Sequence, residues 1–290
     1  MVEDSERAPQ APAGVDLSQP SAARIYDWYL GGEHNWAVDR EFGKRMLRSW
    51  PQARRGSQHN RQFMGRAVRA ATAAGIRQFL DLGSGVPTAG NVHQIVREQL
   101  PADDSARVVY VDHEAVAAAH ARLVLEQEGA TDWAGLVEHD MRRSADVLEA
   151  DETRRLIDFD QPVCLLMIAV LHFVGPDDRP DEVIRSYLDA LPAGSWLALS
   201  HMSSPEDPDQ AAGVGGFAQQ YQNTANPVWL RSQEEIVSLF DGLTMLDPGV
   251  VHLTDWRPDT DPAQLDNEDL AARPFAWCGV GGKPPLDTQA

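Results

Sequence analysis

The sequence predicts an α/β protein built on a doubly wound, mostly parallel, seven-stranded sheet. From residue 76 onward, apolar runs typical of strands alternate with segments of helical periodicity. The runs are almost continuously apolar, as in PVCLLMIAV, which is typical of strands covered on both faces. Right-handed connections between such strands place helices on both sides of the sheet. A glycine-rich turn, DLGSG, follows the first strand.

Helices are predicted ahead of the sheet. SAARIYDWYLGG, residues 21–32, places aromatic and aliphatic side chains on one helical face and ends in a glycine pair. Two more helices are expected over residues 39–49 and 54–74. We expect residues 21–75 to form an N-terminal helical cap. Residues 1–20 are rich in Pro, Ala, Ser and charge, which predicts a disordered tail.

The remaining residues, 76–290, are predicted to form the main domain. Its five parallel strands are expected over residues 77–82, 107–112, 135–140, 162–170 and 195–202. The helices between them are expected over residues 88–100, 114–127, 146–156 and 180–191. Two final strands are expected over residues 244–251 and 275–280. Residues 203–230 are predicted to form a lid insertion with a helix inside it, and Ser232 with Glu235 has the spacing of a capping box at the start of another helix.

Charge and hydropathy limit the partners and the compartment. The 25 basic and 44 acidic residues give a net charge of -19, so the average field repels nucleic acid and anionic lipid. The Arg-rich segment 54–69 is the only candidate basic patch, and a solvated helix face is its alternative. We find no signal peptide and no run of about 20 apolar residues, so we expect a cytoplasmic protein without a membrane partner. Cys164 and Cys278 lie in apolar runs and are predicted to be buried free thiols.

The turn after the first strand has the composition of a ligand-binding loop. Gly83 and Gly85 permit positive φ and a close backbone approach. A dinucleotide site would have a third glycine where Thr88 stands, and Pro87 removes a backbone donor that a pyrophosphate would use. Asp81 precedes the loop, and its carboxylate attracts an ammonium or sulfonium group but repels a diphosphate. The loop therefore favours a cationic ligand over NAD.

Acidic residues also end the next two strands. The Asp112 carboxylate is suited to ribose hydroxyls, because a hydrogen bond to a charged group contributes about 1.5 to 3 kcal/mol. At the third strand, Asp140 is suited to the exocyclic amine of adenine and the backbone amide of Met141 to a ring nitrogen. Together, the three strand ends offer partners for an amino acid, a ribose and an adenine. S-adenosylmethionine contains all three.

These motifs resemble a known family. DLGSG, VDHE and HDM at successive strand ends are similar to the cofactor motifs of Rossmann-like class I S-adenosylmethionine-dependent methyltransferases. ARIYDWYLGGEHNWAVDR, FLDLGSGVPTAGNVH, VVYVDHEAVAAAHARLVL, MIAVLHFV and LALSHM resemble a family of actinobacterial S-adenosyl methyltransferases formerly of unknown function. The similarity runs from about residue 22 to the C-terminus. The chain departs from the broad methyltransferase pattern at Pro87, which leaves the path of the loop beyond Gly85 open.

The resemblance implies where the cofactor lies. The N-terminal helices would fold over it, with Tyr26, Gly32 and Asn35 nearby. Four further residues of the quoted motifs would belong to the same site: Ser84, Thr88, His113 and Ala169. Structural alternatives stay open for the predicted residues: an ordinary turn for the loop glycines, capping for Asp81 and Asp112, a surface turn for Asp140, core packing for Tyr26 and a helix stop for Gly32.

Two histidines are candidate catalytic residues. His172 and His201 end the fourth and fifth strands, and histidine has an unperturbed pKa near 6.5 that suits a general base. Packing beneath the lid is the alternative for both. We predict no metal site, because His113 and His120 are seven residues apart and no cysteine accompanies them.

The sequence therefore predicts a methyltransferase that acts on a small-molecule acceptor. Five aromatic residues are expected to border the acceptor: Trp28, Trp36, Phe217, Tyr221 and Trp229. One alternative is a non-catalytic regulatory protein that binds S-adenosylmethionine. A more distant one is an NAD-dependent oxidoreductase, which the missing third glycine disfavours. The acceptor and the oligomeric state do not follow from the sequence.

Overall fold

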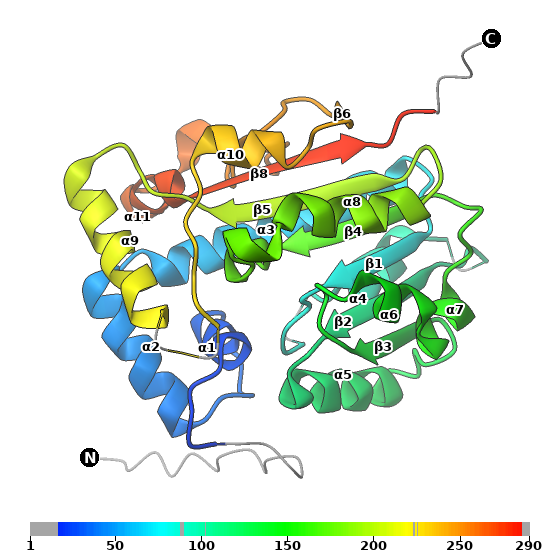
Figure 1. Cartoon of the computed structure of the whole chain (residues 1–290), viewed down its shortest axis with the longest axis horizontal. Helices are drawn as coiled ribbons and strands as arrows, with labels where there is room; N and C mark the ends of the chain where they lie inside the picture. Colours follow the sequence, from blue (N-terminus) through cyan, green and yellow to red (C-terminus); the bar gives the residue numbers. More distant parts are fainter. Residues whose placement is uncertain (1–16, 88–89, 102, 223, 225, 286–290) are drawn as a thin grey trace.

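The computed structural model describes residues 17–87, 90–101, 103–222, 224 and 226–285 (Figure 1). The tail predicted over residues 1–20 falls mostly outside these residues, and so does Thr88. No helix in the described part of the chain is long and apolar enough to span a bilayer. Cys164 and Cys278 are buried free thiols, as predicted.

A single mixed sheet forms the centre of the molecule (Figure 1). Its strands are β1 (Gln78–Leu82), β2 (Arg107–Asp112), β3 (Ala134–Glu138), β4 (Val163–Ile168), β5 (Trp196–Met202), β6 (Thr244–Met245), β7 (Val251–His252) and β8 (Ala276–Gly282). The order is β3-β2-β1-β4-β5-β8-β6, with β7 also paired to β8; β1 to β5 are parallel and β8 is antiparallel to its neighbours. The order reverses between β1 and β4, where open α/β sheets bind ligands beyond the carboxyl ends of the strands.

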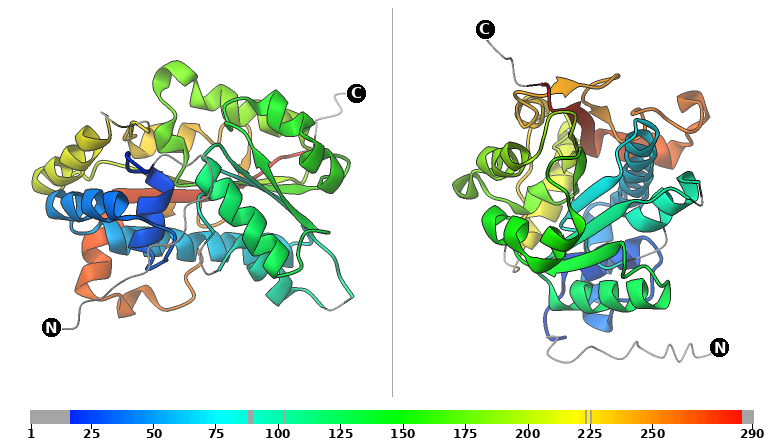
Figure 2. Two further views of the ribbon diagram at one scale, coloured as in Figure 1. Left: turned by 90° about the horizontal axis from the view of Figure 1, so that it is seen from below. Right: turned by 90° about the vertical axis from the view of Figure 1, so that its right-hand side faces the viewer.

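Helices cover both faces of the sheet, as the edge-on view in Figure 2 shows. One face packs against α3 (Ala53–Ala73), α4 (Val92–Gln99) and α5 (Ala115–Gln127). The other packs against α6 (Ser144–Glu149), α7 (Asp151–Leu156), α8 (Pro180–Ala190) and α10 (Gln233–Ser238). The strand side chains alternate between these two apolar layers: Phe79 lies in the first and Leu80 in the second. The prediction of a doubly wound sheet is therefore confirmed.

Most predicted elements agree with the structure to within two residues, and three differ by more. The segment expected as one strand over 244–251 forms β6 and β7, because an Asp-Pro-Gly turn at 247–249 interrupts it, so the sheet has eight strands instead of seven. The helix expected over 146–156 divides at Ala150, which has an extended ψ of 143°. The helix expected over 88–100 begins at Val92, where the Asn91 amide donates to the Gln94 side chain.

A third apolar layer lies at the carboxyl ends of the strands. Here α1 (Ala22–Tyr29), α2 (Ala37–Ser49) and the start of α3 pack against α9 (Pro208–Tyr221), and Figure 1 shows α9 beside α2. A buried ion pair joins α1 to α2: the Asp39 carboxylate accepts from Arg24 Nε at 2.8 Å and from the amides of Ser21 and Trp36. These contacts fix the helices that face the strand ends.

Among the described residues, five short helical elements follow β4 or precede β8. They are η1 (Leu171–Phe173) and η2 (Pro176–Asp178) after β4, and η3 (Pro262–Gln264), α11 (Asn267–Ala272) and η4 (Arg273–Phe275) before β8.

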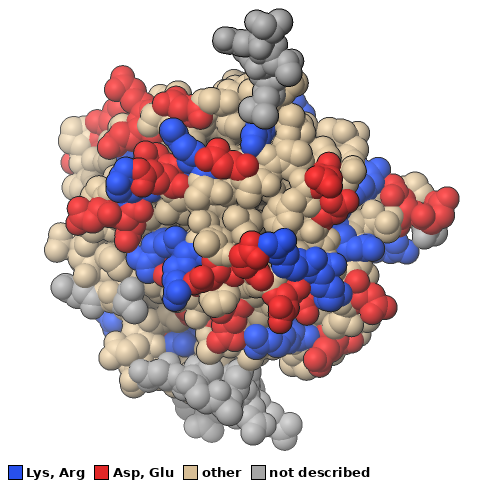
Figure 3. Space-filling view, turned by 45° about the vertical axis from the view of Figure 1, so that its right-hand side comes forward, with Lys and Arg blue, Asp and Glu red and all other residues tan. Residues whose placement is uncertain are grey.

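The arginines of α3 do not form an open basic patch. Arg55 pairs with Asp269, Arg69 pairs with Asp259, and Arg66 is buried and donates to two backbone carbonyls. On the face shown in Figure 3, acidic and basic side chains alternate. The strong basic field that nucleic-acid binding requires is therefore not provided by this helix.

The glycine at position 83 allows two substitutions to be compared. Gly83 and Gly90 have similar φ values of +69° and +74°, so alanine at either site adopts a left-handed conformation that costs about 1–2 kcal/mol. Only at Gly83 would the new Cβ also clash, because it would lie 2.1 Å from Val170 Cγ2. We expect Gly83→Ala to lower the free energy of unfolding by about 1–3 kcal/mol more than Gly90→Ala, measured by urea denaturation.

The double variant Gly83→Ala/Val170→Ala serves as the control. It removes the side chain that the new methyl group would meet, so it should be less destabilised than the sum of its single variants. Equal losses for Gly83→Ala and Gly90→Ala would show that the contact with Val170 is not restrictive.

Candidate active site

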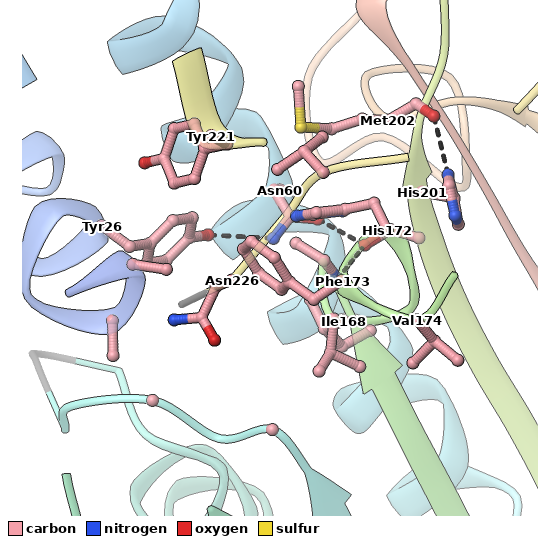
Figure 4. Close-up of a pocket in the computed structure, with 18 of the residues that line it drawn as sticks. Tyr26, Asn60, Ile168, His172, Phe173, Val174, His201, Met202, Tyr221 and Asn226 are labelled. Carbon is pink, nitrogen blue, oxygen red and sulfur yellow. Dashed lines mark hydrogen bonds between the residues drawn. The ribbon is translucent and has the colours of Figure 1, made fainter. Parts of the chain in front are cut away.

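A cavity of about 390 Å³ opens at the carboxyl ends of β1 to β5. Its walls come from these strand ends, from α1, α3 and α9, and from the loop after α9 (Figure 4). The volume is in the range of small-ligand sites. The cavity lies at the point where the strand order reverses, as the sequence predicts.

The glycine loop forms one wall. The amides of Gly83 and Ser84 both donate to the Val111 carbonyl of β2, at 2.8 and 3.1 Å, so the loop turns sharply across the end of the strand. Gly85 has a φ of +67°, and its amide donates to Asp112 Oδ2 at 2.8 Å. The Ser84 hydroxyl is buried and has no hydrogen-bond partner within the described residues. The loop is thus rigidly tied to β2 and retains one unused polar atom.

Two carboxylates follow the loop at the end of β2. Asp112 also accepts the Glu114 amide at 2.8 Å, and its burial raises its pKa above the usual range. The Glu114 side chain accepts from the Ser21 hydroxyl at the start of α1 and from Asn226 Nδ2 at 3.3 Å, and burial raises its pKa too. Asp112 therefore organises the loop, while Glu114 connects the strand end to α1 and to the segment after α9.

Asp81 is the most perturbed acid of the cavity. It is 5% exposed, and burial raises the pKa of its carboxyl to about 7, opposed by the charge of Arg61 and reinforced by Asp112. Arg61 lies on α3 and donates to Asn91 at 2.9 Å, at the far side of the glycine loop. At neutral pH the free protein therefore holds Asp81 close to half-protonated.

Asp140 lines the cavity at the end of β3 but is already paired. Its carboxylate accepts four hydrogen bonds from Arg142, which also binds Asp178 on η2 at 3.0 Å. Burial opposes ionisation of Asp140, but these bonds outweigh it and lower its pKa. The prediction that Asp140 accepts an adenine amine therefore has a competitor in Arg142. The neighbouring Met141 is fixed by a 2.7 Å bond from the Tyr187 hydroxyl to its carbonyl.

A chain of buried hydrogen bonds connects the end of β4 to the N-terminal helices. Ala169, with a φ of +53°, donates its amide to Ser200 Oγ at 2.9 Å. Ser200 donates to Asn60 Oδ1 at 2.6 Å, and Asn60 Nδ2 donates to the Tyr26 hydroxyl at 2.9 Å (Figure 4). Tyr26 in turn donates to the Ser57 carbonyl at 3.1 Å. The chain joins β4, β5, α3 and α1 across one side of the cavity.

The two histidines have different surroundings. His201 Nδ1 donates to the Met202 carbonyl at 2.7 Å, and its Nε2 accepts from Arg231 at 2.5 Å. Burial and then the charge of Arg231 lower the pKa of His201 to about 3. Because Arg231 uses the ring's lone pair, this geometry argues against our prediction of His201 as a base; in Figure 4 its ring lies beyond Met202.

His172 lies on η1 and keeps a free ring nitrogen. Its Nδ1 is buried and has no hydrogen-bond partner in the part of the chain described here, while its carbonyl accepts the Trp229 amide at 2.7 Å. Burial, followed by the nearby His201 and Arg231, lowers the pKa of His172 well below 6.5. The imidazole is therefore neutral at physiological pH.

Most of the sequence-predicted site residues line this cavity. They are Tyr26, Asp81, Gly83, Ser84, Gly85, Asp112, His113, Asp140, Met141, Ala169, His172 and His201. Of the five predicted aromatic residues, Phe217, Tyr221 and Trp229 line it, whereas Trp28 and Trp36 do not. The sequence reasoning did not single out Asn60, Glu114 and Asn226, and only Glu114 lay in a quoted motif, VDHE.

Gly32 and Asn35 lie elsewhere, around Asp27. The Asp27 carboxylate accepts from the His34 amide and from Asn35 Nδ2, both at 2.9 Å. A Cβ on Gly32 would stand 2.0 Å from Asp27 Oδ1. These two residues are thus not part of the cavity wall but enclose a buried acid at the end of α1, and their place near the cofactor stays a prediction.

Comparisons with known proteins agree with this architecture. A family model described as S-adenosyl methyltransferase matches residues 8–284. A solved structure from Thermobifida fusca YX, assigned as a methyltransferase, is 33% identical with a TM-score of 0.84 and covers 94% of this chain and 98% of that one. A DUF574 family protein from Streptomyces avermitilis MA-4680 is 36% identical, also with a TM-score of 0.84, and covers 93% and 99%.

More distant similarity concerns the fold alone. An O-methyltransferase family protein from Burkholderia thailandensis is 14% identical with a TM-score of 0.52, over 81% of this chain and 60% of that one. No curated protein matches the sequence. The fold is that of class I methyltransferases, and the chain belongs to the S-adenosyl methyltransferase family, as a methyltransferase with S-adenosylmethionine as its cofactor.

Proposed function

We propose that this methyltransferase acts on a small organic molecule that binds in the same cavity as the cofactor. The observation that carries the proposal is the extent of the cavity, which reaches from the glycine loop to Phe217 and Tyr221 on α9. Cofactor and acceptor would thus share one cavity. An acceptor of macromolecular size would need an open surface at this place.

The residues at the glycine loop fit the amino acid end of S-adenosylmethionine. That end carries an ammonium group, and an adjacent cation would lower the pKa of Asp81 from its value of about 7 and keep its carboxylate charged. The unpartnered hydroxyl of Ser84 offers a further polar contact. We place the ammonium group beside Asp81 and the carboxylate of the cofactor near the Ser84 hydroxyl, because the amides of Gly83, Ser84 and Gly85 already have acceptors within the protein.

The ends of β2 and β3 would hold the nucleoside. Asp112 accepts the Gly85 amide on one carboxylate oxygen and the Glu114 amide on the other, and a remaining lone pair would accept a ribose hydroxyl. Glu114, the neighbouring acid, is already bound to Ser21 and Asn226. Met141, His113 and the paired Asp140 would border the adenine. The contribution proposed for Thr88 stays a prediction, because Thr88 lies outside the described residues.

When bound, S-adenosylmethionine supplies a methyl group activated by a positively charged sulfur. The protein therefore has to align the acceptor and exclude water, and alignment of this kind contributes roughly 7 to 11 kcal/mol. An acceptor O–H or N–H also has to release its proton. His172 Nδ1 is neutral and unpartnered, so it is the proposed hydrogen-bond acceptor for that proton. His201 would instead position the segment that carries His172, because Arg231 contacts both His201 and the Leu171 and Val174 carbonyls.

The helices around the cavity would act as a cover. We propose that residues 21–75 form a cap and residues 203–230 a lid over the domain 76–290. The support is that α1, α3 and α9 all contribute to the cavity wall. The hydrogen bonds of Glu114 to Ser21 and Asn226 would hold cap and lid against the strand end.

Ligand-induced stabilisation tests the assignment of the cavity. At about 100 times their Kd, S-adenosylmethionine and S-adenosylhomocysteine should each add about 2.7 kcal/mol to the free energy of unfolding, because they bind only the folded state. Thermal denaturation should show a raised Tm with both compounds and none with NAD. A rise with NAD alone would contradict the proposal.

The raised pKa of Asp81 predicts pH-dependent binding. Asp81 is mostly protonated at pH 6 and mostly ionised at pH 8, and the ionised form attracts the ammonium group. We expect S-adenosylhomocysteine to bind about tenfold more tightly at pH 8 than at pH 6, measured by isothermal titration calorimetry. Asp81→Asn is the control. It should bind S-adenosylhomocysteine weakly at both pH values, and any pH dependence of its affinity would come from other titrating groups. Equal slopes in both proteins would remove Asp81 from the site.

Asp112 is expected to matter for the nucleoside. Asp112→Ala loses the proposed ribose bonds and frees the Gly85 amide, so affinity for S-adenosylhomocysteine should fall at least about tenfold. Asp104→Ala is the matched control, since Asp104 pairs with Arg77 at the opposite end of the sheet. Unchanged affinity in Asp112→Ala would place the ribose elsewhere.

A further inference from the structure

Charged side chains occupy only one half of the cavity wall. Most come from the ends of β1 to β3: Asp81, Asp112, Glu114, Asp140 and Arg142. Asp177 and Asp178 lie on η2 beside Arg142, which binds Asp178. Arg61 is the charged contribution of α3 to the wall, and it binds Asn91 next to the glycine loop. Most of these charges therefore lie in the proposed cofactor half, and Glu114 stands at its boundary, where its charge adds to the effect of burial that raises the pKa of Tyr221.

The other half is apolar and aromatic. Trp50, between α2 and α3, lies with its ring 4.9 Å from that of Phe217 and 5.0 Å from that of Phe275. Phe217 is 4.9 Å from Tyr221, and Tyr221 is 6.4 Å from Phe173 beside His172. In Figure 4, Tyr221, Phe173 and Tyr26 gather at this side of the cavity. Such a set of rings suits a flat aromatic ligand, because aromatic pairs gain from stacked and edge-on contacts.

This half also contains unused hydrogen-bonding groups. Trp50 is only 6% exposed, and its indole N–H is buried without a hydrogen-bond partner in the described ranges. His172 Nδ1 is likewise unpartnered. The first group is a donor and the second, in the neutral ring, is available as an acceptor. Both atoms are covered by protein in the free state, so a ligand with an oxygen that accepts and a hydroxyl that donates would satisfy both after the side chains around them shift.

We propose that the methyl acceptor is an uncharged aromatic molecule carrying at least one hydroxyl group, bound between Trp50, Tyr221 and His172. The inference rests on the proposed function, because it assigns the half of the cavity that the cofactor leaves open. The hydroxyl is the group that would take the methyl and release its proton.

The charges around the aromatic half favour an uncharged acceptor over one that carries a carboxylate or an ammonium group. A carboxylate would need a cation in the aromatic half, but Arg231 is bound to His201 and to the carbonyls of Leu171 and Val174. An ammonium group would need a carboxylate, and Glu114 at the boundary is bound to Ser21 and Asn226. Burial of an unpaired charge is unfavourable by several kcal/mol, so both kinds of ligand are disfavoured.

The test uses the protein saturated with S-adenosylhomocysteine and three probes that share one ring system. They are 2-naphthol, 2-naphthoate and 2-naphthylmethylammonium. We expect 2-naphthol to bind at least about tenfold more tightly than either charged probe, measured by calorimetry or by saturation-transfer NMR. If S-adenosylhomocysteine binds but 2-naphthol does not, or if a charged probe binds as well, the acceptor assignment is wrong. If S-adenosylhomocysteine itself does not bind, the proposed function fails first.

A pair of tryptophan variants tests whether the ring system of 2-naphthol lies beside Trp50. Trp50→Phe keeps an aromatic side chain but removes the N–H, so 2-naphthol should bind about two- to tenfold more weakly while S-adenosylhomocysteine binding is retained. Trp256→Phe is the matched control: Trp256 is also buried with an unpartnered N–H, but it packs on Phe63 outside the cavity wall. Unchanged 2-naphthol affinity in Trp50→Phe would overturn the placement.

A second variant covers the case in which Trp50→Phe does not fold. Phe217→Leu keeps an apolar side chain on α9 but removes one ring from the wall. It should weaken 2-naphthol more than it weakens S-adenosylhomocysteine, because Phe217 lies among the aromatic rings of Trp50 and Tyr221 and not at the ends of β1 to β3. Equal weakening of both ligands would contradict a separate aromatic half.

Discussion

The site depends on one buried amide, the side chain of Asn60. Its two ends bind groups from different layers of the molecule: Nδ2 donates to Tyr26 on α1, and Oδ1 accepts from Ser200 on β5. Through Ser200 the same chain reaches Ala169 beyond β4, where the backbone has a left-handed conformation. The position of the N-terminal helices and the shape of the strand ends are therefore not independent. A buried amide satisfied on both sides strongly restricts how these elements meet.

Electrostatics divides the cavity as clearly as packing does. Burial raises the pKa of Asp81, Asp112 and Glu114, which lie at neighbouring strand ends. Ionisation of several buried acids side by side is unfavourable unless a cation joins them. These acids therefore gather at the strand ends where we propose that the positively charged cofactor binds, and the aromatic rings lie beyond Glu114. The cationic methyl donor would therefore be attracted to the acidic strand ends, and the uncharged methyl acceptor to the aromatic rings.

The parts of the site that are local in sequence could be predicted from it. The glycine loop and Asp112 lie within a few residues of strand ends, and strand ends follow from apolar runs. The direction in which Gly32 and Asn35 face could not be predicted, because a motif does not give the direction of its side chains; here they enclose Asp27.

Asn60 could not be found in the sequence, because its partners are 34 and 140 residues away in the chain. The same holds for His201, whose role depends on Arg231, 30 residues later. Long-range hydrogen bonds leave no periodic signal. The sheet as a whole was predictable, since each of its strands is a separate apolar run, whereas the split of 244–251 depended on one Asp-Pro-Gly turn.

The contact between Gly83 and Val170 has a consequence beyond the stability of this chain. One residue follows β1 and the other follows β4, and the room for a side chain at one is taken by the side chain of the other. In sequences that keep this backbone, a larger residue at 83 requires a smaller one at 170. When a side chain appears at position 83 during evolution, the residue at position 170 should therefore become smaller.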